Sequence, residues 1–165
     1  MHESRHETRG GRVIEARVTG WVLAALGVAV IVVAAVQPWF VAHGVDGYAE
    51  MAGWGAWRRT GDVDASLRPL PLGVLVCLTA GAMIAGALRG AFGVAVIGAM
   101  ATFAVAVLPY MLMPAVDRNA PGTAAVGVDV GSGPVLLLGL GLAVTIVSWI
   151  GYARCVLRPA PRAGA

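Results

Sequence analysis

Long apolar stretches alternate with polar segments along this chain, and the longest apolar stretch covers residues 70–112. Its only ionisable side chains are Cys77, Arg89 and Tyr110. The Arg89-Gly90 pair divides it into halves of 19 and 22 residues, which would be ~28 Å and ~33 Å long as helices. Each half matches the hydrocarbon core of a bilayer, which is roughly 30 Å thick. The pattern predicts a transmembrane helical hairpin over residues 70–88 and 91–112.

Two further apolar stretches, residues 18–40 and 134–152, are also long enough to cross a bilayer as helices. The first follows a basic segment, as in a signal peptide, but it is too long for a signal sequence and lacks a small-residue cleavage site. Trp21 near its start and Trp39 near its end are typical of aromatic residues at the two membrane interfaces. The sequence therefore predicts an all-α integral membrane protein, a bundle of four transmembrane helices.

The predicted transmembrane domain covers residues 18–153 and includes two longer loops, residues 41–69 and 113–133. Polar segments flank this domain at both ends of the chain. Residues 1–17 are expected to form a disordered tail, because they combine many charges with few apolar side chains. Residues 154–165 form a second tail, rich in Arg, Pro and Gly.

The second loop contains a pattern with a period of two. Val126, Val128 and Val130 alternate with Gly127 and Asp129, which is typical of a short strand. We expect this strand to pair with an extended piece of the first loop. The two loops would then form a small β cap over one end of the bundle.

Composition agrees with the membrane class. Of the 165 residues, 58% are hydrophobic and 13% are charged, and the mean hydropathy is +0.78. The net charge of +3 is not organised as a basic stripe interleaved with aromatic residues, which argues against nucleic-acid binding.

The distribution of arginine predicts the topology. All twelve basic residues are Arg, and four spans place the two termini and the hairpin turn on one side. That side carries eight of them: Arg5, Arg9, Arg12, Arg17, Arg89, Arg154, Arg158 and Arg162. The other side carries four: Arg58, Arg59, Arg68 and Arg118. The positive-inside rule therefore predicts a multi-pass protein of the inner (plasma) membrane with both termini in the cytoplasm and both loops outside.

Small residues are expected to bring the helices together, because close backbone approach drives helix association in lipid. Such residues recur four apart in all four predicted spans, and in the first span they are Gly20 with Ala24 and Ala25 with Ala29. The predicted packing positions are Ala82, Gly86, Gly90, Ala95, Ala99, Gly139 and Ala143.

The first loop is the best candidate for recognition. Trp54 and Trp57 lie three residues apart and are followed by Arg58 and Arg59. Trp and Arg most often dominate binding interfaces, so these four residues form a predicted partner-binding site. The alternative is that the aromatic side chains anchor the loop in the membrane interface.

Catalytic chemistry is not indicated. The four predicted spans contain no Asp, Glu, Lys, Arg or His, which argues against an ion-coupled pump. The outer residues His43, Asp46 and Glu50 follow no catalytic or zinc-binding spacing. Cys77 and Cys155 are expected at different depths, so they predict neither a disulfide nor a metal site. The sequence thus predicts no enzyme, no cofactor, no metal site and no small-molecule substrate.

Three resemblances bear on function. Pro38-Trp39 and Arg89-Gly90 lie in a layout that resembles the actinobacterial tryptophan-operon-associated four-span membrane proteins. The segment Gly53-Trp54-Gly55-Ala56-Trp57 is similar to the motif of claudin-type four-span proteins, whose first outer loop adds strands to a small sheet. This chain lacks their outer cysteine pair. By context, small four-span subunits also resemble accessory parts of the mammalian-cell-entry lipid importers.

These observations predict a non-enzymatic accessory subunit of a larger bacterial inner-membrane complex, with lipid transport as the candidate activity of that complex. Its expected partners are membrane lipids and other membrane-protein subunits. The alternative is a small oligomeric transporter or channel for a neutral or apolar solute, with Thr and Ser hydroxyls lining the path.

Overall fold

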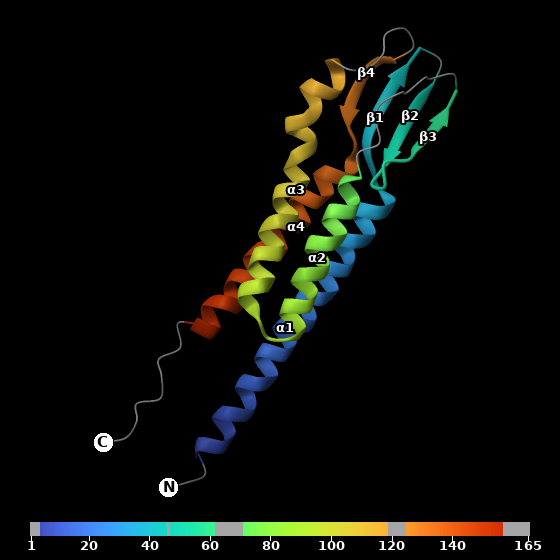
Figure 1. Ribbon diagram of the computed structural model, residues 1–165. Coiled ribbons are helices and arrows are strands. Elements are labelled where there is room, and N and C mark those ends of the chain that lie inside the picture. The colour runs from blue at the N-terminus through green and yellow to red at the C-terminus, as the bar shows by residue number, and fades with distance from the viewer. Residues whose placement is uncertain (1–3, 46, 62–70, 119–124, 157–165) are drawn as a thin grey trace.

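The computed structural model describes residues 4–45, 47–61, 71–118 and 125–156 (Figure 1). Over these residues the chain forms four helices and four strands. The helices are α1 (Ser4–Val36), α2 (Leu72–Leu88), α3 (Phe92–Arg118) and α4 (Ser132–Val156). The strands are β1 (Pro38–Gly44), β2 (Tyr48–Ala52), β3 (Trp57–Thr60) and β4 (Ala125–Val130).

The four helices pack as a ring in chain order, each against two neighbours (Figure 1). The chain reverses between α2 and α3 at Gly90, whose φ of 72° favours glycine. The amide of Ala91 donates to the carbonyl of Gly86 at 2.8 Å and closes this turn. Both chain ends lie at the end of the bundle that carries this turn, and the strands lie at the opposite end.

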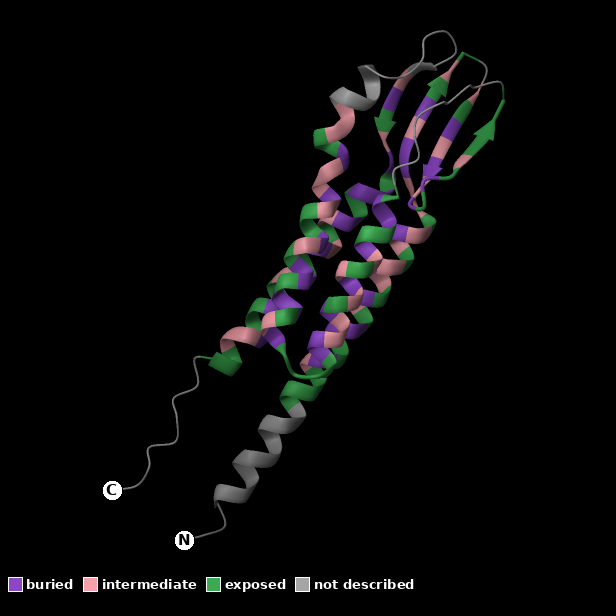
Figure 2. Cartoon of the chain, in the orientation of Figure 1, coloured by how far each residue is buried: buried purple, intermediate pink, exposed green. Residues whose placement is uncertain are grey.

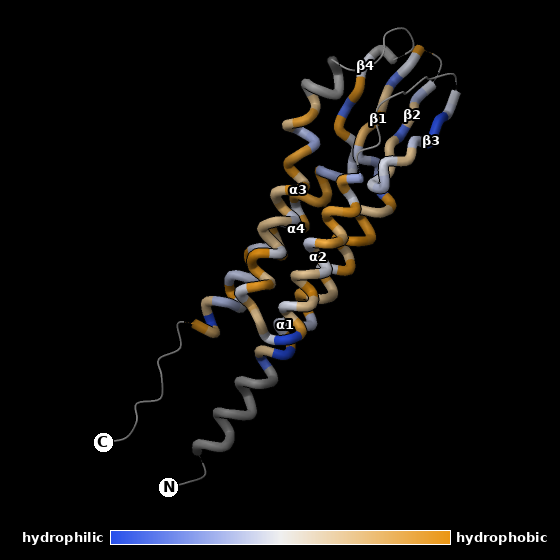
Figure 3. Tube along the Cα trace, viewed as in Figure 1, coloured by the Kyte–Doolittle hydropathy of each residue, from blue (hydrophilic) through white to orange (hydrophobic). Residues whose placement is uncertain are grey.

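Three of the described helices contain segments long and apolar enough to cross a membrane: Glu15–Val36, Phe92–Met113 and Ser132–Val156. The remaining helix, Leu72–Leu88, is apolar but has 17 residues, fewer than the 19 predicted. Figure 3 shows that the helices are mostly apolar and that hydrophilic positions lie at the α2–α3 turn and along β3.

The strands form one antiparallel sheet in the order β3-β2-β1-β4. The first loop supplies β1, β2 and β3, and the second loop supplies β4, which pairs with β1. The strand predicted from the alternation of Val126, Val128 and Val130 is confirmed, as is its pairing with the first loop.

The sheet has one apolar and one polar face. Phe40, Met51, Ala42, Ala49 and Val128 lie in alternate rows and are buried (Figure 2). The outer end of α3 lies alongside β4 and contributes apolar side chains to the same core. The intervening rows carry polar side chains, which face away from this core.

The start of the chain differs from its prediction. Helix α1 begins at Ser4, within the segment predicted as a disordered tail, and projects beyond the other helices (Figure 1). It ends at Val36, before the predicted end at residue 40. Trp39 and Phe40 therefore belong to β1 and are fully buried, so the prediction that Trp39 marks a membrane interface is wrong. Pro38 explains the early end, since a proline has no amide to donate to the helix.

The third and fourth helices are both longer than predicted. Helix α3 continues past the buried Pro109 to Arg118, within the predicted second loop. Helix α4 begins at Ser132, before the predicted start at residue 134, and ends at Val156, after the predicted end at residue 152.

Candidate functional site

The junction between α1 and β1 is organised around Trp39. In a helix the carbonyl of Ala34 would accept from the amide of residue 38, but that residue is Pro38, which has none. The indole Nε1 of Trp39 donates to this carbonyl instead, at 3.0 Å. The pairing of β1 with β2 shifts register between Pro38 and Phe40, so Trp39 sits in a bulge. A bulge can re-aim a side chain, and here the indole lies against the helix end.

Glycines allow the sheet to approach the helix ends closely. The amide of Gly73 in α2 donates to the carbonyl of Gly53 at 2.9 Å, and the amide of Gly131 donates to that of Trp39 at 2.9 Å. A Cβ at Gly53 would lie 2.8 Å from Nε1 of Trp39 and would overlap the carbonyl of Ala34. The sheet is therefore fixed to α1 and α2, and the residue before α4 is fixed to β1.

A side-chain hydrogen bond strengthens the same junction. The hydroxyl of Ser132, at the start of α4, donates to Oε1 of Gln37 at 2.9 Å. These two residues are separated by 95 positions in the chain, so this bond links the start of α4 to the segment between α1 and β1.

The polar face of the sheet carries His43, Tyr48, Glu50, Arg58 and Asp129. Nε2 of His43 lies 3.5 Å from Oδ2 of Asp129, and this pair joins β1 to β4. Their side chains are 57% and 74% exposed, so the pair contributes little to stability. Arg58 lies directly opposite Glu50 in the register of β2 and β3.

Sequence reasoning missed the pairing of His43 with Asp129. It compared His43 with Asp46, which lies outside the described residues, and with Glu50. The signal was nevertheless present, because pairing β4 with β1 brings the two loops together. Among the described residues, no group of three His, Cys, Asp or Glu side chains could hold a metal ion. Cys77 and Cys155 are both free thiols.

The four predicted partner-binding residues lie along one edge of the sheet but do not share one face. Trp54 lies in the turn between β2 and β3 and is 52% exposed. Trp57 begins β3 and packs its half-buried ring against the core. Arg58 and Arg59 follow in the strand, both exposed, and alternation directs them to opposite faces.

Trp54 and the two arginines lie at different distances from the helix bundle. Its neighbour Gly53 accepts a hydrogen bond from Gly73 in the first turn of α2, so Trp54 lies at the helix end of the sheet. Strand β3 leads away from the helices towards Thr60 (Figure 1). Trp54 therefore lies close to the helix bundle, whereas Arg58 and Arg59 lie further from it.

The predicted packing residues divide into two groups. Gly86, Ala95 and Ala99 are buried between helices, and a Cβ at Gly86 would lie 2.8 Å from the amide nitrogen of Ala95. The others are exposed and do not pack between the described helices: Ala82, Gly90, Gly139 and Ala143. Gly90 serves the turn instead.

Two further glycines lie at close helix contacts: Gly98 was not predicted, whereas Gly20 belongs to the predicted stripe of the first span. A Cβ at Gly98 would lie 2.8 Å from the amide nitrogen of Met83, and one at Gly20 would lie 2.9 Å from the carbonyl oxygen of Ala87. Small-residue spacing shows which stripes exist, but it does not show which of them faces a neighbour.

Three of the hydroxyls within the helices, those of Thr79, Thr102 and Thr145, bond to one another or to the backbone. The Oγ1 atoms of Thr79 and Thr102 lie 2.9 Å apart and connect α2 to α3. Thr102 also donates to the carbonyl of Gly98 at 2.9 Å, and Thr145 donates to that of Gly141 at 2.7 Å. Ser148 is buried in α4, and its hydroxyl has no hydrogen-bond partner among the described residues.

The end of the bundle near the termini combines aromatic and cationic side chains. Trp149 and Tyr152 of α4 form an edge-on pair with ring centroids 5.8 Å apart, and Trp21 of α1 is 62% exposed. Arg89 and Arg154 are exposed at the same end. Such a band of Trp, Tyr and Arg is typical of a membrane interface.

Comparison with known proteins gives no relative from which a function could be inferred: no protein-family model, curated protein or solved structure matches this chain.

Proposed function

We propose that this protein spans the bacterial inner membrane four times, with both termini in the cytoplasm and the sheet outside. The apolar part of α1 between Arg17 and Gln37 would be ~30 Å long, which equals the thickness of a bilayer core. Helices α1 and α3 both lead from the termini end to the sheet end. The chain must therefore return through α2. This shorter helix is then also a span, which brings the number of spans to four. The excess of Arg at the termini supports the orientation.

In this orientation the protein acts as a non-enzymatic accessory subunit of a larger inner-membrane complex, and lipid transport is the candidate activity of that complex. The observation that carries this proposal is the placement of β3. It is an edge strand whose outer side is not paired within the described sheet, and it presents Arg58 and Arg59. Edge strands readily accept a further strand from a partner, and Arg provides charge-assisted hydrogen bonds.

The rigid junction supports the same function. Trp39, Gly53 and Gly131 fix the sheet to the helix ends, so a partner bound to β3 would be held at a defined position relative to the bundle. A docking subunit needs this property, because mobility at the junction would add to the entropy lost on binding.

Co-purification tests this function directly. The chain would be expressed at native level, extracted in a mild detergent and its partners identified by mass spectrometry. We expect a stoichiometric membrane-protein partner that is lost from the Arg58→Glu, Arg59→Glu double variant. Arg89→Glu, a charge reversal at the opposite end of the bundle, is the matched control and should retain the partner. A wild-type protein that purifies alone or only as a self-oligomer would contradict the accessory role.

The alternative, a small oligomeric transporter or channel for a neutral or apolar solute, lacks a specific observation in its favour. It requires Thr and Ser hydroxyls along a path. Thr79 and Thr102 bond to each other instead, and Thr145 bonds to the backbone.

A further inference from the structure

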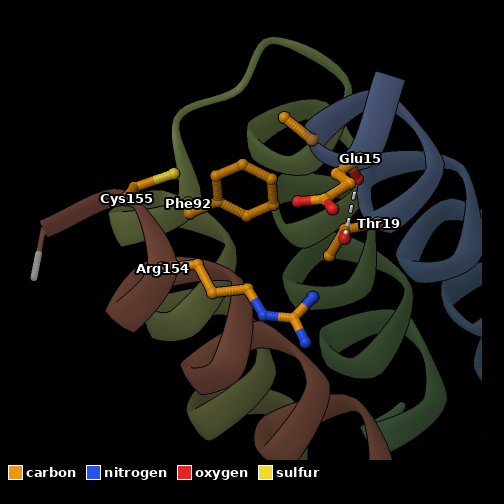
Figure 4. Close-up of a pocket in the computed structure, with 6 residues that line it drawn as sticks. Glu15, Thr19, Phe92, Arg154 and Cys155 are labelled. Atoms are coloured by element: carbon orange, nitrogen blue, oxygen red, sulfur yellow. Dashed lines mark hydrogen bonds between the residues drawn. The ribbon is translucent and has the colours of Figure 1, made fainter. Parts of the chain in front are cut away.

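Helix α1 leaves the bundle at the level shown in Figure 4. There the start of α3 at Phe92 and the end of α4 at Arg154 lie beside Glu15 and Thr19 of α1. The pocket that these residues line has a volume of about 20 Å³, which is room for one water molecule and for no larger ligand. The part of α1 that precedes this level has no role in the proposed function.

This projecting segment is residues 4–17, which continue the helix beyond the other three helices (Figure 1). Glu15, Ala16, Arg17 and Val18 are all exposed. Four consecutive positions of an α-helix point to all of its sides, because they make one turn. None of the described elements therefore covers the helix where it leaves the bundle.

One face of α1 runs through the bundle and continues along the projecting segment. The same intervals of three or four residues lead back from this face through Ala16 to Arg12, Arg9 and Arg5. Because an α-helix has 3.6 residues per turn, all these positions share one face. Inside the bundle the face consists of buried residues at these intervals: Gly20, Leu23, Gly27, Val30 and Ala34. The face that other helices cover inside the bundle thus carries arginine where it is uncovered.

The acidic residues of the projecting segment lie off this face. The segment contains four arginines and two glutamates. Glu7 lies on the opposite side of the helix from Arg5, Arg9 and Arg12, and Glu15 lies roughly a quarter of a turn away from them. A group that covers the basic face must therefore be acidic.

The helical form of the projecting segment also calls for a partner. An isolated helix shorter than about 12–15 residues is only marginally stable in water. Gly10 and Gly11 lie within the segment, and each of them weakens the helix further. A bound partner would supply the packing that the bundle supplies to the rest of α1.

Three other candidates for this cover fit the basic face poorly. The C-terminal residues 157–165, which lie outside the described residues, contain Arg158 and Arg162 and no acidic residue. The inner leaflet is anionic, but Arg5 lies ~18 Å further along the helix than Arg17, beyond the Debye length of about 8 Å at physiological ionic strength. Nucleic acid is disfavoured because the segment contains no Trp, Tyr or Phe among its arginines.

We propose that this basic face of α1 binds an acidic helix of a cytoplasmic protein. Carboxylates four and three residues apart on the partner helix would lie opposite Arg5, Arg9 and Arg12, because side chains at these intervals share one face. Arginine forms charge-assisted, often bidentate hydrogen bonds with carboxylates. The inference uses the proposed orientation only to place the projecting segment in the cytoplasm, and it is independent of docking through β3.

Binding of a fluorescent peptide to the full-length protein, in micelles of a neutral detergent, tests the proposal. The probe is three repeats of Glu-Ala-Ala-Ala-Glu-Ala-Ala, which place the glutamates on one helix face. The control peptide has the same composition, with its glutamates spread around the helix. At low ionic strength we expect the probe to bind about tenfold more tightly than the control peptide, the effect of two or three exposed ion pairs. Added salt should weaken the binding.

Two double variants test the residues of the basic face. Arg5→Gln with Arg9→Gln should weaken binding of the probe about tenfold, and Gln retains the helix because its propensity is close to that of Arg. Arg158→Gln with Arg162→Gln removes the same charge from the C-terminal tail and should bind the probe as the wild type does.

Substitutions of one glycine test the helical geometry separately from the charge. Gly11→Pro keeps every charge but interrupts the helix between Arg9 and Arg12, so it should remove the preference for the probe over the control peptide. Gly11→Ala favours the helix and should keep that preference.

The proposal is overturned if the wild type binds the two peptides equally, if the two double variants have equal effects, or if Gly11→Pro keeps the preference. Two competitors complete the test. If phosphatidylglycerol in the micelles or a single-stranded RNA displaces the probe at a lower concentration of negative charge than the unlabelled probe does, the basic face serves a membrane or a nucleic acid, and the proposal is likewise overturned.

Discussion

The indole Nε1 of Trp39 donates a hydrogen bond to the carbonyl oxygen of Ala34 at 3.0 Å, within the last turn of α1. Both residues are fully buried. In a continuous helix the amide of residue 38 would donate to this carbonyl, but Pro38 has no amide hydrogen. The side chain of Trp39 therefore replaces the missing donor at the point where the chain leaves the helix. The same side chain holds the sheet on the bundle.

Trp39→Phe should therefore destabilise the protein. The ring would still fill most of the site, but the buried carbonyl of Ala34 would lose its donor, at a cost of about 1–3 kcal/mol. Unfolding by denaturant in detergent micelles would measure the change. Trp21→Phe, at an exposed position of α1, is the matched control and should change the free energy of unfolding by less than about 0.5 kcal/mol. Equal effects of the two substitutions would argue against the role of the Trp39 bond.

Substitution by alanine should have opposite effects on stability at Gly86 in α2 and at Gly139 in α4. A Cβ at Gly86 would lie 2.8 Å from the amide nitrogen of Ala95, whereas one at Gly139 would meet nothing within 4 Å. Gly86→Ala should cost about 1–3 kcal/mol through overpacking. Gly139→Ala should be neutral or stabilise by up to about 1 kcal/mol, because Ala favours the helix. Thermal unfolding of both variants checks this difference, and a Gly86→Ala variant with unchanged Tm would refute the helix contact.

The hydroxyls of Thr79 and Thr102 should be coupled energetically. They lie 2.9 Å apart within the apolar bundle, and bonds of this kind in membrane proteins contribute about 0.6 kcal/mol on average. A double-mutant cycle with Thr79→Val and Thr102→Val measures the interaction. We expect a coupling energy of about 0.5–1.5 kcal/mol. Additive effects of the two substitutions would mean that the hydroxyls act separately.

The two tryptophans of the first loop should respond differently to truncation. Trp57 packs against the core, so Trp57→Ala should destabilise the isolated protein by about 2 kcal/mol or more. Trp54 is exposed in the turn, and Trp54→Ala should leave the Tm in detergent nearly unchanged. Its effect should appear in bilayers, as weaker protection of the loop from proteolysis. A large loss of stability in detergent for Trp54→Ala would contradict its assignment as an interfacial anchor.

Much of the fold follows from the period of the apolar pattern. The long apolar runs predict the helices, and the alternation at residues 126–130 predicts β4 and its pairing with the first loop. Apolar side chains at every second residue lie on one face only if the segment is a strand. A period of two is therefore a specific signal even in a short segment.

The helix ends were less predictable because they depend on tertiary contacts. The run from residue 18 to residue 40 is apolar except for Thr19 and Gln37, and the apolar residues continue beyond Gln37, so hydropathy does not show that the helix ends at Val36. Pro38 was the available signal. The burial of Trp39 in a bulge depends on its contact with Ala34, which no local pattern shows.

The candidate sites were predictable only in part. The edge position of Arg58 and Arg59 requires the strand order, and the sequence offers several ways to arrange the first loop. A small pocket at one end of the bundle is lined by both Glu15 and Arg154, which are far apart in the chain and line the same pocket only because α1 packs beside α4. Likewise, Gly139 and Gly86 belong to similar small-residue stripes, and only the rotation of each helix in the bundle distinguishes them.

Cysteine accessibility in intact cells measures the proposed orientation of the bundle in the membrane. Cys155 at the end of α4 is a native reporter for the termini end, and Val45→Cys, at an exposed position in the β1–β2 turn, reports on the sheet end. Both would be studied in a Cys77→Ala background, with Cys155→Ser added for the second. A membrane-impermeant maleimide should label Val45→Cys in intact cells and should label Cys155 only after permeabilisation. Labelling of Cys155 in intact cells, with Val45→Cys protected, would contradict the account.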